Sequence, residues 1–219
     1  LSCAGNLIDK KKKGYKTGII DLTRGELGTR GTAETRDQEA QISAAILDLD
    51  VRENLDLGDG FFEESKEHLI AIIGVIRKYK PKILLANAIR DRHPDHARAA
   101  KLVERAAFLS GLVKIKDEYN QKPHRPKIIL HYIQDRWIEP DIVVDITKHY
   151  TQKIEAIKAF KTQFFDPEST EPETPISGSN FFAYLDGRAR EFGRYAQTEF
   201  AEGFTKSKAL PIDDLCHFL

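Results

Sequence analysis

The sequence has no methionine, only two cysteines and no excess of either charge, and each of these shortages narrows the class of protein. Cys3 and Cys216 lie far apart and form neither a CxxC pair nor a disulfide framework. The 34 basic and 34 acidic side chains cancel, so net charge attracts neither a nucleic acid nor a membrane surface. No apolar run reaches the ~18 residues of a membrane span, and no signal peptide is visible. The composition predicts a cytoplasmic protein with one globular domain over residues 1–219.

Hydrophobic periodicity predicts strands that alternate with helices along the chain. We expect strands in 14–23, 51–62, 82–89, 127–134 and 141–147, and helices in 32–50, 63–81, 94–111, 149–164 and 180–194. The Pro- and Ser-rich stretch 166–180 predicts a loop, and the tail from residue 201 predicts largely irregular structure. Such alternation is typical of a layered α/β sandwich with a mainly parallel sheet.

Polar residues gather where three of the predicted strands end. The clusters are DLTRGELGTR (21–30), NAIRDRHPDH (87–96) and HYIQDRW (131–137). In open α/β sheets, ligands bind outside the carboxyl ends of the strands. The sequence therefore predicts a ligand site where these three clusters meet.

The stretch RDRHPDH, residues 90–96, is the one most able to carry chemistry. His93 and His96 are three residues apart across a predicted helix start, so both rings can face one cleft. Imidazole is the commonest metal ligand and, when protonated, a general acid, and Asp95 could orient one ring. Ordinary helix capping by a surface segment is the competing interpretation. Two histidines also fall short of the three protein ligands that a catalytic zinc usually takes.

Several blocks together resemble one family, the zinc-dependent N-acetylglucosaminyl deacetylases, known as the PIG-L or LmbE-like family. The blocks are DLTRGELGTRGTAETRDQEA, NAIRDRHPDHARAAKLV, KPHRPKIILHYIQD, PDIVVDIT and KIEAIKAFKTQF. They are most similar to the branch that deacetylates N-acetylglucosaminyl malate in bacillithiol biosynthesis. The resemblance implies a Rossmann-like three-layer fold, a Zn²⁺ cofactor, a small N-acetylglucosamine conjugate as substrate and a homo-oligomer.

The resemblance also implies roles for individual residues. His96 would be a zinc ligand, His93 the electrophilic or acid histidine, and Asp95 would tune its neighbours. Arg36 is a candidate substrate-binding residue, with a surface ion pair to Asp37 or Glu39 as the alternative. Arg92 and Asp91 would either touch the malate end of the substrate or pair locally.

One part of the family pattern does not occur in these 219 residues. The family's H-P-D-D motif supplies a His and an Asp to the zinc and a second Asp as general base, and it precedes a segment like LSCAGNLI, where this chain opens. Because residue 1 is leucine, we expect the first strand and this motif to precede the printed chain. A chain without them would be inactive and would bind zinc poorly. The alternatives are a deacetylase of another small conjugate and a metal-free Rossmann-like binding module.

Overall fold

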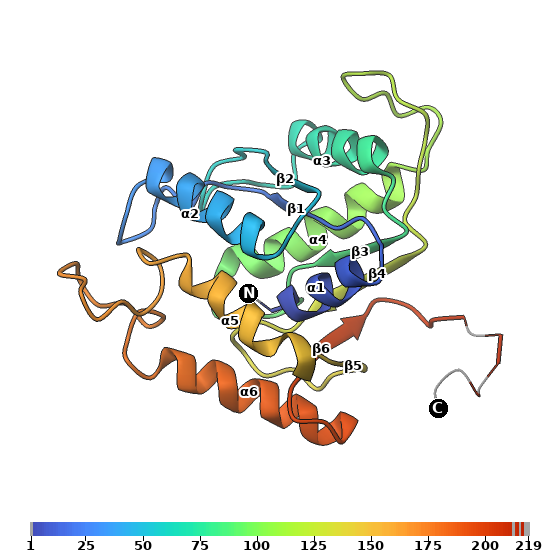
Figure 1. Cartoon of the computed structure of the whole chain (residues 1–219). Coiled ribbons are helices and arrows are strands. Elements are labelled where there is room, and N and C mark those ends of the chain that lie inside the picture. The colour runs from blue at the N-terminus through green and yellow to red at the C-terminus, as the bar shows by residue number, and fades with distance from the viewer. Residues whose placement is uncertain (1, 212, 215, 217–219) are drawn as a thin grey trace.

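The computed structural model describes residues 2–211, 213, 214 and 216, and shows helices and strands in alternation (Figure 1). The elements are α1 (Ala4–Lys12), β1 (Gly18–Asp21), α2 (Ala33–Ile46), β2 (Val51–Asn54), α3 (Lys66–Tyr79), β3 (Ile83–Ala86), α4 (Pro94–Leu109), β4 (Ile128–Tyr132), β5 (Ile142–Asp145), the 3₁₀ turn η1 (Thr147–His149), α5 (Tyr150–Lys158), α6 (Phe181–Ala196) and β6 (Ala201–Lys206). The predicted α/β alternation is confirmed. In this part of the chain, no helix is both long and apolar enough to cross a membrane.

The strands form two sheets, and the larger one is mixed. β1 and β2 pair in parallel, as do β3 and β4. β6 then lies antiparallel between β4 and β5, giving the order β3-β4-β6-β5. The expectation of a mainly parallel sheet is therefore confirmed only in part. The prediction that the tail is largely irregular was wrong for Ala201–Lys206, which forms the central strand β6.

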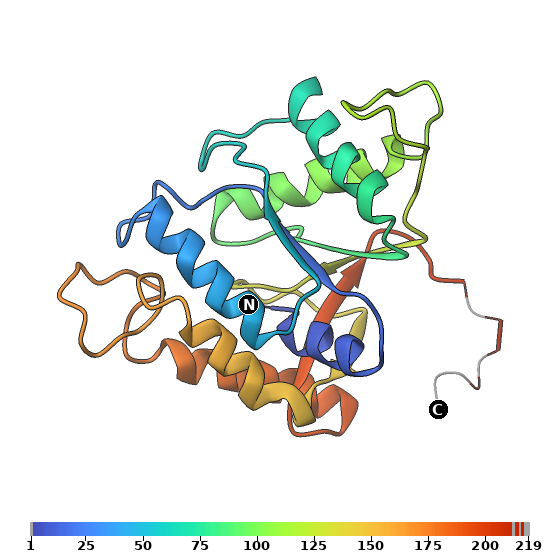
Figure 2. The same cartoon turned by 45° about the horizontal axis from the view of Figure 1, so that its top comes forward.

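Helices cover the strands from two sides. In Figure 2, α3 and α4 lie on one side of the strands, and α2, α5 and α6 lie on the other. The main apolar core lies under the α3–α4 layer and includes Ile73, Ile76, Leu102 and Ala106. This core follows from the apolar stripes of the two helices, which place these side chains at i, i+3 and i+4 spacings.

Local sequence signals determine where α2, α3 and α4 begin. Thr32 caps α2 by accepting the backbone N–H of Thr35, and the Thr35 hydroxyl accepts the N–H of Thr32 in return. Ser65 caps α3 by accepting the N–H of His68. Pro94 occupies the first turn of α4, where its missing N–H costs no hydrogen bond.

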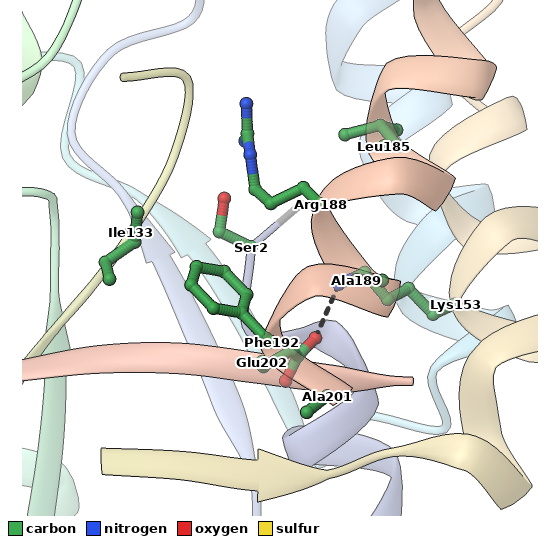
Figure 3. A pocket seen from close by; sticks show the side chains of 9 residues that line it. All are labelled: Ser2, Ile133, Lys153, Leu185, Arg188, Ala189, Phe192, Ala201 and Glu202. Atoms are coloured by element: carbon green, nitrogen blue, oxygen red, sulfur yellow. Dashed lines mark hydrogen bonds and ion pairs between the residues drawn. The ribbon is translucent and has the colours of Figure 1, made fainter. Parts of the chain in front are cut away.

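The first helix is fastened to the strand that comes last in the chain. No side chain next to α1 caps it, but the buried Glu202 carboxylate of β6 accepts the N–H groups of Gly5 and Asn6, each at 2.9 Å. The Lys153 ammonium on α5 balances the charge of Glu202 at 2.8 Å (Figure 3). A carboxylate at a helix N-terminus also interacts favourably with the helix dipole. Glu202 thus holds α1 to β6 and sets where residues 2–5 lie.

Two glycines of α6 should respond oppositely to alanine, because one faces the backbone of the segment between α6 and β6 and the other faces open space. A Cβ at Gly193 would lie 2.6 Å from the Thr198 carbonyl oxygen and 2.7 Å from that of Glu199. We expect Gly193→Ala to lower the free energy of unfolding by about 1–3 kcal/mol, as overpacking does. A Cβ at Gly187 would meet nothing within 4 Å, so Gly187→Ala should add about 1 kcal/mol through helix propensity. Urea unfolding of both variants measures the contrast, and equal effects would contradict this packing of α6.

Candidate active site

The polar segments that follow β3 and β4 meet at one end of the larger sheet. These strands are parallel neighbours, so residues 87–96 and 133–137 emerge side by side. His131 Nδ1 binds the Asn87 carbonyl oxygen at 2.8 Å and joins the two strand ends. His93 then caps α4, which places both histidines of the HPDH block at the start of that helix. The predicted convergence is therefore confirmed for two of the three clusters, whereas the third, residues 21–30, starts at the end of β1 in the smaller sheet.

His96 is held in one tautomer by a buried carboxylate. Its Nδ1 makes a short hydrogen bond to Oδ2 of Asp91, whose side chain is fully buried. Because a carboxylate only accepts, Nδ1 carries the proton and a neutral ring keeps a free lone pair on Nε2. A carboxylate behind the first ring nitrogen is the usual arrangement of metal-binding histidines. His96 can therefore act as a ligand or as a base through Nε2.

His93 has the complementary tautomer. Its Nδ1 accepts the backbone N–H of Asp95 at 3.3 Å, so in the neutral ring Nε2 carries the proton and is a donor. The two rings lie 5.4 Å apart between centroids and are tilted by 38°. This pair places one hydrogen-bond donor and one acceptor next to each other, which is a useful arrangement for proton transfer or for polarising a carbonyl group.

Asp91 binds the loop after β4 in addition to His96. Its Oδ1 accepts the backbone N–H groups of Asp135 at 2.9 Å and Arg136 at 2.7 Å. Burial alone raises the pKa of Asp91, but the backbone N–H of Arg136, the His96 ring and the backbone N–H of Arg92 outweigh burial and leave its pKa below the ordinary value. Asp91 is therefore ionised at neutral pH and ties the loop after β4 to the loop after β3.

Asp95 does not orient either imidazole with its carboxylate, contrary to the expectation from the sequence. Its Oδ2 accepts the N–H of Gly60 at 2.8 Å, and its Oδ1 pairs with Arg98 at 2.7 Å. Because the side chain at a helix N1–N3 position points along the helix surface, it reaches the loop after β2 instead. Asp91 has the orienting position that Asp95 was expected to have.

The two arginines named from the sequence lie in different surroundings. Arg92 is exposed and pairs with Asp135 at 3.3 Å, next to the Asp91 bonds. Arg36 is half-buried, donates to the Arg30 carbonyl oxygen at 3.1 Å, and has its pKa lowered by burial. Its suggested partners are engaged elsewhere, Asp37 with Arg24 and Glu39 with Thr162. The structure thus places Arg92 at the site, and among the described residues Arg36 makes no hydrogen bond to its histidines.

Arg188 of α6 also reaches this region, which was not predicted from the sequence. It donates to the Asp135 carbonyl oxygen at 2.7 Å, and burial lowers its pKa. Arg188 lines a cavity of about 20 Å³ together with Ser2, Ile133 and Phe192, and extends away from Glu202 (Figure 3). A volume of this size holds about one water molecule. Because 180–194 has the pattern of a packing helix, only the fold shows that one of its arginines approaches Asp135.

The described residues do not form a complete zinc site. His96, with Asp91 behind it, has the chemistry and orientation of one ligand. No group of three or more His, Cys, Asp or Glu side chains able to hold a metal ion occurs among residues 2–211, 213, 214 and 216. A catalytic zinc takes three protein ligands and a water molecule. These residues alone therefore do not fit the ion.

Comparisons with known proteins agree with this arrangement. The family model of the GlcNAc-PI de-N-acetylases, PIG-L, matches residues 1–107. Diacetylchitobiose deacetylase of Thermococcus kodakarensis is 28% identical over 194 residues, which cover 85% of this chain and 67% of that protein. The 4-oxalmesaconate hydratase of Pseudomonas putida is 27% identical over 174 residues, 69% of this chain and 64% of that protein. The chain thus spans about two thirds of the length of these relatives.

A solved structure extends the likeness over nearly the whole chain. A conserved protein of Thermus thermophilus is 31% identical, with a TM-score of 0.85, and the match covers 97% of this chain and 91% of that one. The family model covers the HPDH block and the strand before it. With the structural match over the remaining residues, the chain belongs to the PIG-L family.

Proposed function

We propose that the protein is a deacetylase that hydrolyses the acetamide of a small N-acetylglucosamine conjugate. The observation that carries the proposal is the pair of complementary histidines on the HPDH block, one with a donor Nε2 and one with an acceptor Nε2. The description of the matching family model and the diacetylchitobiose deacetylase relative support an acetamide substrate.

The chain's own residues can be given roles in this reaction. His93 donates from Nε2 to the acetamide oxygen or to the leaving amine, and its donor state follows from the N–H of Asp95 on Nδ1. Asp91 holds His96 in the tautomer whose lone pair faces the ligand. Asp95 fixes the start of α4 through Gly60 and Arg98, and so keeps His93 in place.

We further propose that zinc is the cofactor and that His96 is one of its ligands. When bound, zinc would lower the pKa of a water molecule to about 7 and polarise the acetamide carbonyl.

The substrate we favour is N-acetylglucosaminyl malate, whose acetamide and carboxylates would be recognised separately. Arg92 is exposed beside Asp91 and Asp135, where it can bind a carboxylate in a bidentate manner. Arg36 is the second candidate, since burial lowers its pKa and no acidic side chain pairs with it among the described residues. Other small N-acetylglucosamine conjugates remain the alternative substrates.

Acetate release by the purified protein tests the proposal directly. We expect acetate from N-acetylglucosaminyl malate, less from N-acetylglucosamine, and about one zinc per chain by elemental analysis. Because one relative is a hydratase, 4-oxalmesaconate and water are assayed in parallel by the loss of the conjugated chromophore. Hydration without acetate release would contradict the proposal. If the protein contains no zinc and catalyses neither reaction, the result would support the binding-module alternative.

A further inference from the structure

The side chain of Gln134 is locked beside the acceptor nitrogen of His96. Gln134 follows β4 and is only 9% exposed. Its Oε1 lies 3.3 Å from the backbone N of Ala88 and 3.3 Å from Nδ2 of Asn87. Both of these partners donate, and an amide nitrogen in that position would face two donors. The oxygen and nitrogen of the Gln134 amide are therefore assigned by the surrounding hydrogen bonds.

This orientation directs the Gln134 amide nitrogen at the site. Its Nε2 lies 3.4 Å from Nε2 of His96, whose proton is on the other ring nitrogen. The amide nitrogen has two N–H groups, and His96 can accept only one of them. A ligand atom that approaches Nε2 of His96 consequently meets a neutral donor whose position is already fixed.

The support behind Gln134 makes its position rigid. Asn87 and Ala88 follow β3 directly, and the Asn87 carbonyl oxygen binds Nδ1 of the buried His131 on β4. Gln134 therefore bridges the ends of two paired strands rather than extending from a free loop. A donor held in advance stabilises developing negative charge without the cost of reorganising at the moment of reaction.

We propose that Gln134 donates a hydrogen bond to the acetamide oxygen of the substrate, and that this bond strengthens as the oxygen becomes negatively charged. The inference rests on the proposed deacetylase function. It assigns to Gln134 a direct contact with the reacting group, separate from the donor role proposed for His93.

The experiment compares Gln134→Leu and Gln134→Glu with wild type in the full-length natural protein. Leucine removes the donor at similar size, and glutamate keeps the acceptor for Ala88 but has no N–H when ionised. We expect kcat for acetate release to fall about a hundredfold in both variants, as for other oxyanion donors, with KM changed less than about threefold. Gln121→Leu is the matched control, because the Gln121 amide donates to the Gly74 carbonyl oxygen away from the histidines.

A second readout does not depend on turnover. In wild type, the ¹⁵N chemical shifts of His96 in the metal-free protein should show protonated Nδ1 and a hydrogen-bonded, unprotonated Nε2. Gln134→Leu should shift the Nε2 resonance and Gln121→Leu should not; an unchanged resonance overturns the contact itself. Full kcat in both Gln134 variants, or a rise in KM alone, overturns the role in catalysis. Wild type that releases no acetate defeats the proposed function and, with it, this role.

Discussion

Replacement of His96 with alanine should reduce acetate release about a thousandfold or more, the scale of losing a residue essential to the reaction. The variant removes the Nε2 lone pair and leaves Asp91 buried without its imidazole partner. Zinc content should fall as well, because we propose His96 as a zinc ligand. Steady-state kinetics and elemental analysis of the same preparations measure both effects.

Two further variants make this result specific. Asp91→Asn leaves His96 in place but weakens control of its tautomer, so we expect a smaller loss of about 10- to 100-fold. His124→Gln is the control, since His124 binds the Pro81 carbonyl oxygen at the opposite end of β3. A His96→Ala protein that folds normally, as judged by circular dichroism, and retains its activity would show that the reaction occurs elsewhere.

Replacement of Arg77 with methionine should lower the free energy of unfolding by about 3–5 kcal/mol, the usual cost of breaking a buried ion pair. Arg77 and Asp117 have side chains that are each 1% exposed, and they meet at 2.7 Å. The guanidinium also donates to the carbonyl oxygens of Ser110, Leu112 and Ile115. The Arg77 side chain thus provides hydrogen bonds to three carbonyl oxygens after α4, and its loss leaves Asp117 charged and buried.

The dependence on pH provides an internal check of this prediction. Burial raises the pKa of Asp117, but Arg77 and two backbone N–H groups outweigh it and lower the pKa below the ordinary value. Such a group stabilises the native state above its unfolded pKa and loses that effect as pH falls through its native pKa. The difference between wild type and Arg77→Met should therefore shrink in acid. The control Arg194→Met removes an exposed pair with Glu191 and should lower the free energy of unfolding by less than about 1 kcal/mol. An equal loss in both variants would contradict the stabilising role of the Arg77–Asp117 pair.

Features that depend on neighbouring residues in the chain were predictable from the sequence. The cap at Thr32, the proline at the start of α4 and the apolar stripes of α3 and α4 all occur as expected, because a helix start and its buried face are decided within a few residues. The position of His93 and His96 beside the end of β4 also follows from the alternation of strands and helices.

Features that depend on distant partners were not predictable. The segment AEGFTK forms a strand whose first five residues are all buried. Its glutamate, glycine and lysine are uncommon in buried strands, so the sequence did not predict it. Glu202 is tolerated there because Lys153 and the N-terminus of α1 satisfy it. In the same way, sequence spacing favoured Asp95 as the partner of an imidazole, whereas packing brings Asp91 to His96.

The position of β6 has a consequence for how the protein folds during synthesis. β4 and β5 are made before β6, yet each of them pairs with β6 and they do not pair with each other, and β6 begins at residue 201. The contact between Gly5 and Glu202 spans 197 residues. On the ribosome, the edges of β4 and β5 that pair with β6 therefore stay unpaired while the nascent chain lengthens by more than fifty residues, since β5 ends at 145. Open strand edges attract other chains, so this interval is when chaperone protection should matter most.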